Sequence, residues 1–196
     1  MKIEYIKNNY KFETLTEEHD LTMFEWDSED LNVFLKNDAL KQQNEKLNLT
    51  KLITCEGEII GFVSLLTDSM KLKLLRDEVE KEKIKGKLNV SENNPIPAIK
   101  IGRFAIDKKY TKHGLGSQIL RNILYNLQEI AEKNVGLRFV VVEGYATAYN
   151  FYVTNNKFKN LKKDEKNLNK IEIGHPPKLI FLFLIFYNCV IYFLFF

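Results

Sequence analysis

Apolar side chains recur at helical spacing in two parts of the chain. Asp27-Ser28-Glu29-Asp30 is typical of a helix start, because acidic residues are favoured at the positive end of the helix dipole. The stripe that follows predicts an amphipathic helix to about Asn44: Leu31, Phe34, Leu35 and Ala39. A longer stripe predicts a second helix that ends before Gly136: Leu115, Ile119, Leu120, Ile123, Leu124, Leu127, Ile130 and Ala131.

Runs of apolar and β-branched residues predict strands. Lys51–Cys55 and Glu58–Leu66 flank Glu56-Gly57, which predicts a hairpin with a tight turn. Ala98–Ile106 and Leu137–Val142 are apolar on both faces, as strands inside a sheet are. Because a long helix separates these last two strands, they should run parallel. We therefore expect an α+β fold with a mixed central β-sheet flanked by helices.

The segment between the hairpin and the next strand is dense in lysine and glutamate. Met70–Val90 carries only scattered apolar residues, so we expect a solvated helix there. We interpret residues 70–95 as a charged helical insertion and Asn93–Pro97 as a loop. Further along, Ala148–Asn155 predicts a short helix.

The length of 196 residues is that of one domain, which we assign to residues 1–178. Leu179–Phe196 follows without a charged residue. As a helix it would reach about 27 Å, just under a bilayer core of about 30 Å. Three interpretations stay open: a final strand over Leu179–Ile185 with an apolar end, a membrane anchor, and a shifted reading frame.

Composition narrows the function classes. The 29 basic and 26 acidic residues give a formal charge of +3, so the total does not indicate a nucleic-acid-binding protein. A local lysine excess over residues 157–178 could still meet an RNA backbone. Cysteines and histidines are scattered, so we predict no metal site. The amino terminus has no signal-peptide core, so a cytoplasmic location is expected, with membrane association through residues 179–196 left open.

The candidate chemistry lies in the loop Thr111-Lys112-His113-Gly114-Leu115-Gly116-Ser117. Two glycines let a ligand approach the backbone, and loop amides together with a helix amino terminus converge on an anion. Taken alone, such a glycine pair would more simply start a helix. Its place between a buried strand and a long amphipathic helix favours a phosphate loop, although it lacks the P-loop and dinucleotide-binding signatures.

Several stretches resemble the GNAT family of N-acetyltransferases, over roughly Phe24 to Phe158. Ile101–Asp107, Tyr110 and His113–Gly116 are similar to the family's acetyl-CoA motif, and Ala148–Tyr152 to its A-x-x-F-Y motif. Leu31–Leu35 and Gly61–Leu65 resemble a branch that includes toxins acetylating aminoacyl-tRNA. The sequence departs from the family in three places: Thr111 stands where Gln or Arg is usual, Glu143-Gly144 where many relatives have Asp-Ala, and the segment after Tyr152 is one residue longer.

The resemblance implies an enzyme that moves an acetyl group from acetyl-CoA to a primary amine by direct attack. It implies a splayed pair of parallel strands in which Phe104, Ala105 and Ile106 contact pantetheine. The pyrophosphate would lie on the loop, which consists of Thr111, Lys112, His113, Gly114, Leu115, Gly116 and Ser117. Tyr152 would protonate the departing thiolate, although Phe151 and Tyr152 could instead be core aromatics. Glu143 is a candidate base by location only.

The acceptor and the class of function remain open at this point. A small molecule, a protein terminus or an aminoacyl-tRNA could supply the amine, and an oligomer is compatible with the sequence. The competing interpretation is a non-catalytic CoA-binding or membrane-tethered interaction module built on the same fold.

Overall fold

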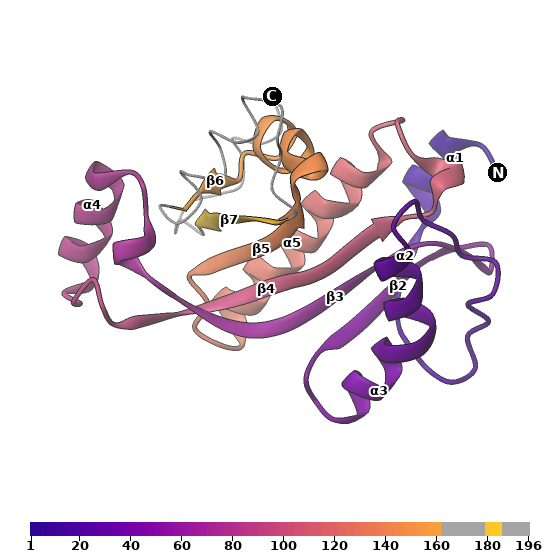
Figure 1. The fold of residues 1–196 in the computed structure, drawn as a ribbon, viewed down its shortest axis with the longest axis horizontal. Helices are drawn as coiled ribbons and strands as arrows, with labels where there is room; N and C mark the ends of the chain where they lie inside the picture. The colour runs from indigo at the N-terminus through magenta and orange to yellow at the C-terminus, as the bar shows by residue number, and fades with distance from the viewer. Residues whose placement is uncertain (162–178, 186–196) are drawn as a thin grey trace. The chain divides into compact units, whose positions relative to one another are not determined.

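The computed structural model describes residues 1–161 and 179–185 (Figure 1). Its strands form a seven-stranded sheet in the order β1-β2-β3-β4-β5-β7-β6. The strands are β1 Lys11–Thr14, β2 Leu49–Cys55, β3 Glu58–Lys71, β4 Pro95–Ile106, β5 Phe139–Tyr145, β6 Lys159–Asn160 and β7 Leu179–Ile185. The α-helices are α1 Ile3–Asn9, α2 Glu29–Val33, α3 Ala39–Asn44, α4 Glu78–Leu88 and α5 Leu115–Lys133. The expected α+β fold with a mixed sheet is confirmed.

The chain divides into two compact units. The first consists of Met1–Leu66 and Ile101–Asn122, and the second of Thr67–Lys100 and the residues from Ile123 onward. Each unit has a hydrophobic core of its own.

The first unit begins with an antiparallel meander. β1 pairs with β2, and β2 pairs with β3. Glu56 and Gly57 join β2 to β3 with φ angles of 49° and 76°. Positive φ at both central residues defines a type I′ turn, whose twist matches that of the flanking strands. The predicted hairpin with a tight turn is therefore confirmed.

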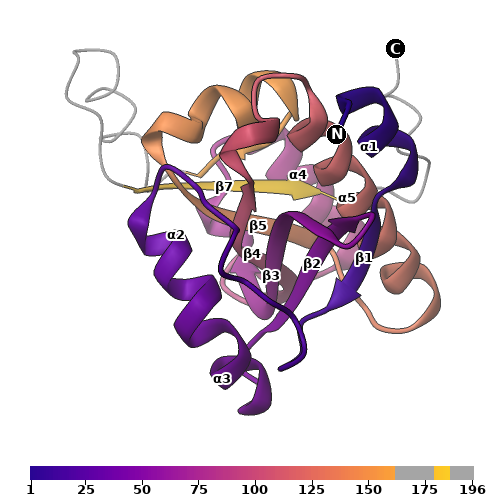
Figure 2. The ribbon, with the colours of Figure 1, turned by 90° about the vertical axis from the view of Figure 1, so that its right-hand side faces the viewer.

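The predicted helix over residues 31–44 is confirmed, with an internal irregularity. α2 and α3 are joined without a break by a π-type turn over Phe34–Asp38. Figure 2 shows α2 and α3 on one side of β2 and β3. Their buried residues share a core with both strands: Leu31, Phe34, Leu35 and Ala39 pack with Leu52 and Phe62.

Two elements before Asp27 have no counterpart in the sequence analysis. α1 buries a single side chain, Ile6, and β1 is only four residues long. One buried residue and a mostly exposed strand make no periodic signal. The structure ties α1 to the first half of α5, since the Gln118 amide donates to the Lys7 carbonyl at 2.8 Å (Figure 2).

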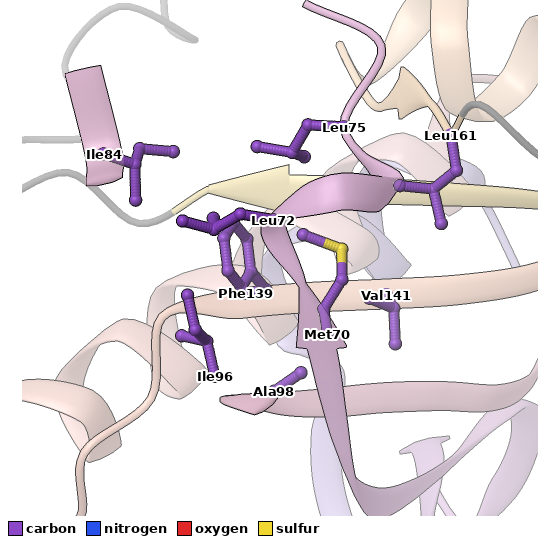
Figure 3. Close-up of a cluster of buried hydrophobic side chains, with 9 residues drawn as sticks. All are labelled: Met70, Leu72, Leu75, Ile84, Ile96, Ala98, Phe139, Val141 and Leu161. Atoms are coloured by element: carbon purple, nitrogen blue, oxygen red, sulfur yellow. The ribbon is translucent and has the colours of Figure 1, made fainter. Parts of the chain in front are cut away.

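The core of the second unit corrects the interpretation of residues 70–95. β3 continues to Lys71 and β4 already begins at Pro95, so the predicted loop at Asn93–Pro97 is wrong in its last part. Only Glu78–Leu88 is α-helical, leading from β3 back towards β4 (Figure 1). Its inner face is not solvated: Ile84 lies in a cluster with Met70, Leu72, Leu75, Ile96, Ala98, Phe139, Val141 and Leu161 (Figure 3).

Strand directions in the second unit follow from two contacts between β4 and β5. The Arg138 amide donates to the Pro97 carbonyl at 3.0 Å, and the Lys100 ammonium pairs with the Glu143 carboxylate. Residue numbers rise together on both strands, so the strands run parallel, as predicted. β7 pairs antiparallel with β5 on one side and with β6 on the other. This confirms the final strand over Leu179–Ile185, while Tyr187–Phe196 lies outside the described residues.

Candidate cofactor loop and catalytic tyrosine

The candidate cofactor loop begins at a buried carboxylate. Asp107 follows β4 and is only 1% exposed. Its side chain accepts hydrogen bonds from the Lys109 amide at 2.9 Å and from the Glu25 amide at 3.0 Å. These bonds start a short 3-10 turn over Lys108–Tyr110. A buried carboxylate with two amide donors is a stable anchor, because its charge is compensated by hydrogen bonds.

The turn is closed by the residue that departs from the family pattern. The Thr111 hydroxyl donates to the Lys108 carbonyl at 3.1 Å. Its hydrogen is therefore used inside the loop.

The next residues have a backbone suited to binding an anion. Lys112 and Gly114 both have positive φ angles, 68° and 76°. A lysine in this region is uncommon, and such outliers cluster at functional sites. Nothing lies within 4 Å of a Cβ placed on Gly114, so this face of the loop is open. Concave turns of this kind present successive amides to an anion.

Helix α5 begins directly after the loop. The Gly114 carbonyl accepts from the Gln118 amide at 3.2 Å, which makes Gly114 the residue that precedes the first helical turn. Leu115 is buried at 1% exposure and fixes the helix to the core, while Gly116 and Ser117 are half-buried. First-turn amides have no acceptor within a helix, and the dipole of this 19-residue helix favours negative charge at the same end.

Two of the three lysines around the loop are paired with acids. Lys108 pairs with Glu25 at 2.5 Å, and Lys109 pairs with Glu58 at 3.3 Å. Lys112 is exposed and has no acidic partner within the described ranges 1–161 and 179–185. The cation available to a bound phosphate is therefore Lys112, with the exposed side chain of His113 beside it.

Tyr110 links the loop to β3 from below. It is buried, and its hydroxyl donates a hydrogen bond to the Glu58 carboxylate. The same carboxylate accepts a hydrogen bond from the Lys109 ammonium. The hydrogen bond from Tyr110 lowers the pKa of Glu58, and Lys109 adds to this effect. Burial, followed by the bond to Glu58, raises the pKa of Tyr110. Glu58 therefore stays ionised and holds two consecutive loop residues.

The strand that leads into the loop approaches β3 closely. Ala105 and Ile106 are buried, and Phe104 is half-buried. A Cβ on Gly61 would lie 2.5 Å from the Ala105 carbonyl oxygen, so only glycine fits at this position. The first unit thus brings together all the predicted cofactor residues, from Phe104 to Ser117, in one strand, loop and helix start.

Tyr152 belongs to the second unit and lies in a π-type turn over Asn150–Asn155. A π turn holds one more residue than an α turn, which accommodates the extra residue noted in this segment. The ring is 5% exposed and makes edge contacts with Phe151 and Phe158, with centroids 4.9 and 5.4 Å away. Gly144 lies against it, since a Cβ there would be 3.2 Å from a ring carbon.

The Tyr152 hydroxyl has no hydrogen-bond partner within the part of the chain that the structure describes. Burial alone raises its pKa. The group is therefore a protonated donor whose hydrogen no described residue accepts. The ring packs among core aromatics, as one earlier interpretation expected, and the role of the hydroxyl as a proton donor stays a prediction.

Glu143, the base candidate by location, is engaged by a lysine. Its carboxylate pairs with Lys100 across β4 and β5, and both side chains are about three-quarters buried, at 26% and 25% exposure. The ion pair joins the two parallel strands and occupies this carboxylate. Its position therefore favours a structural contact between the strands over a role as base.

Asp107, Glu58 and Gly61 complete the loop site, and none was among the predicted site residues. Glu58 and Gly61 lie about fifty residues before the loop, too far along the sequence for a local motif to include them. Asp107 directly precedes the loop. An acidic residue at the end of a buried apolar strand was the available signal.

No protein-family model matches the chain. A tRNA-acetylating toxin from Mycobacterium tuberculosis is 27% identical over 141 residues, which cover 71% of this chain and 78% of that protein. Among solved structures, a mutant of KacT matches with a TM-score of 0.70 at 20% identity, covering 88% of this chain and 94% of that one. AtaT complexed with acetyl-methionyl-tRNA matches with a TM-score of 0.69 at 21% identity, covering 90% and 95%.

The chain resembles the GNAT acetyltransferases in sequence and shares the fold of these solved structures. AtaTR, solved with acetyl-CoA bound, shares the fold at a TM-score of 0.64 and 19% identity, covering 91% of this chain and 94% of that one. The GNAT resemblance and the fold expected from it are thus confirmed. Within residues 1–161 and 179–185, no helix is long and apolar enough to cross a membrane.

Proposed function

We propose that this protein is an acetyl-CoA-dependent N-acetyltransferase whose acceptor is the α-amino group of an aminoacyl-tRNA. The observation that carries the proposal is the loop between β4 and α5. Its left-handed Lys112 and Gly114, its open face and the start of α5 form the anion site that a pyrophosphate requires.

Each part of the loop has a distinct role in holding acetyl-CoA. Backbone amides around Gly114 and Gly116 receive the pyrophosphate, and Lys112 adds a charge-assisted contact. Backbone groups of Phe104 and Ile106 pair with the pantetheine amides in the manner of an added strand. Asp107 and Glu58 fasten the start of the loop by hydrogen bonds to Lys109 and Tyr110.

Acetyl-CoA supplies a thioester, and the acceptor amine attacks its carbonyl carbon. The new C–N bond forms as the C–S bond breaks, and the sulfur leaves as a thiolate. Tyr152 holds a proton at its hydroxyl and transfers it to that sulfur. The nitrogen loses a proton to solvent as the amide forms, and solvent returns a proton to the Tyr152 hydroxyl. The ring contacts with Phe151 and Phe158 fix the direction in which the hydroxyl points.

The acceptor amine needs no strong base. An α-amino group has a pKa of about 7.7–8.0, so part of it is neutral at pH 7. Glu143, the base candidate by location, forms an ion pair with Lys100. Two of the similar proteins support this choice of acceptor, since one is named a tRNA-acetylating toxin and AtaT is solved with acetyl-methionyl-tRNA.

The proposal is tested by offering the full chain radiolabelled acetyl-CoA and four acceptor pools. These are aminoacyl-tRNA, the same tRNA without its amino acid, free amino acids, and peptides with free amino termini. We expect label on aminoacyl-tRNA alone, and mass spectrometry of the nuclease digest should show an N-acetylated aminoacyl-adenosine. Label on peptides or free amines would change the acceptor. Binding of acetyl-CoA without turnover on any pool would indicate a non-catalytic module.

A further inference from the structure

Asp107 joins two segments that are far apart in the sequence. Of its two carboxylate oxygens, Oδ1 accepts from the amide of Lys109 in the loop, and Oδ2 accepts from the amide of Glu25. The backbone amide of Asp107 donates to the Ile60 carbonyl at 2.8 Å, which fixes the backbone of Asp107 beside β3. Because the side chain is almost fully buried, water cannot replace either bond.

Glu25 also accepts a backbone hydrogen bond from the start of the loop. The Lys108 amide donates to the Glu25 carbonyl at 3.0 Å, next to the ion pair between the two side chains. The backbone of Phe24–Trp26 thus lies along the start of the loop like a short strand. Phe24 is 2% exposed and anchors this segment in the hydrophobic core of the first unit.

Asn32, at the start of α2, holds the same segment from its other side. The Asn32 carboxamide accepts from the Trp26 amide and donates to the Trp26 carbonyl, both at 2.8 Å. Trp26 therefore lies between two side-chain clamps, Asn32 and Asp107. Hydrogen bonds run without interruption from α2 to the phosphate loop.

We propose that Asp107 is a positioning residue that couples the phosphate loop to Phe24–Trp26, so that acetyl-CoA binding at the loop alters the surroundings of Trp26. The proposal rests on the proposed function, which places acetyl-CoA at this loop. One carboxylate bonds to both segments, so a shift of Lys109 displaces the acceptor of the Glu25 amide. The segment cannot then keep the geometry it has without ligand.

The chain itself supplies the probe, since Trp26 is its single tryptophan. Acetyl-CoA is titrated into the full chain without acceptor while the fluorescence of Trp26 is recorded, with free tryptophan amide as the optical control. Calorimetry measures affinity in parallel. We expect a saturable change in Trp26 emission whose midpoint equals the calorimetric Kd.

Asp107→Asn keeps the size of the side chain but leaves one of the two amides without an acceptor. Acetyl-CoA should bind roughly tenfold more weakly, the factor typical for one lost hydrogen bond to a charged group, and the Trp26 response should disappear. Asp20→Asn is the matched control, because among the described residues the Asp20 carboxylate accepts hydrogen bonds from the nearby Thr22 and from no residue of the loop. That variant should behave as wild type in both measurements.

A second pair of variants tests the link without touching Asp107. Glu25→Pro removes the amide that donates to Asp107 and leaves the bond to Lys109 intact, so the Trp26 response should be lost with a smaller change in affinity. Glu25→Ala keeps the amide and should keep the response.

Two results would overturn the coupling in a protein that binds acetyl-CoA: no change in Trp26 emission at saturation, or a wild-type response in Glu25→Pro. A purely structural Asp107 predicts lower melting temperatures with unchanged affinity and response. Absence of acetyl-CoA binding in the wild-type chain would instead refute the proposed function.

Discussion

Tyr152 joins a tightly packed ring to a hydroxyl that no described residue engages. Tyr152→Phe preserves the ring and deletes the proton. General acid catalysis contributes about 10²–10⁴-fold, so kcat should fall by that order while acetyl-CoA affinity and melting temperature stay close to wild type. Steady-state kinetics, calorimetry and thermal melting measure the three quantities.

Tyr152→Ala is the companion variant for the packing role. Removing a buried aromatic ring costs about 3–5 kcal/mol, so this variant should lose stability as well as activity. Full turnover in Tyr152→Phe would assign the proton to solvent or another group and leave Tyr152 as a core residue.

The raised pKa of Tyr152 also sets an expectation for the pH profile. An unperturbed tyrosine has a pKa of about 10, and burial raises this one further. A raised pKa favours the protonated donor, so kcat should not decline through loss of this proton below about pH 10. The expectation would be contradicted if kcat of the wild-type protein declined with a midpoint well below about pH 10 and the residual activity of Tyr152→Phe showed no such decline.

At the scale of elements, the phosphate loop depends on its backbone shape. Gly114 has a φ of 76°, where a β-branched residue is strained, and its open face is the proposed path of the pyrophosphate. Gly114→Val should weaken acetyl-CoA binding by at least about tenfold while the protein stays folded. Gly136→Val is the control, because Gly136 also faces open space and its φ is not positive. Unchanged calorimetric affinity in Gly114→Val would remove the loop from the site.

The connection from β3 to β4 should behave as part of the core rather than as a removable insertion. Ile84 in α4 is 1% exposed, so Ile84→Ala should destabilise the protein by about 2–5 kcal/mol. Val79, on the same helix and 81% exposed, provides the control: Val79→Ala should change stability by less than about 0.5 kcal/mol. Denaturant unfolding measures both, and equal effects would show that the inner face of α4 contributes no packing.

These elements also show what could be predicted from sequence. α5 carries a complete apolar stripe and was predicted nearly to its ends. The extension of β3 was missed because Thr67, Asp68 and Ser69 are polar and interrupt the apolar run. α4 was interpreted as solvated because it buries only Ile84 and parts of Glu80 and Lys81, whose charged ends reach ionic partners.

The loop illustrates the same limit at the site. Its glycines and its place between a strand and a helix are local patterns, so they could be identified. The residues that contact it from elsewhere in the sequence, Glu25, Glu58 and Gly61, are brought to the loop only by the tertiary fold. Likewise, Lys108 and Lys109 count as free positive charge in a sequence, and only the structure pairs them with acids.

At the scale of the whole molecule, β7 completes the sheet by pairing with β5. The pairing covers all of β5, from Phe139 opposite Ile185 to Tyr145 opposite Leu179. A chain that stops at residue 178 would leave this apolar strand as an open edge, which invites pairing between molecules. We expect such a chain to be recovered mostly in aggregates, whereas one that stops at residue 185 should have a normal far-ultraviolet spectrum. A monomeric, cooperatively melting chain without β7 would show that the strand is dispensable.

The place of β7 in the sheet has a consequence for how the protein is made. β7 lies between β5 and β6, although both of those strands precede it in the chain. β5 and β6 therefore leave the ribosome before the strand between them, and their shared neighbour must insert last. Long-range pairing of this kind is slow and leaves apolar edges exposed to chaperones and to other nascent chains. The second unit can complete its sheet only after residue 185 has left the exit tunnel.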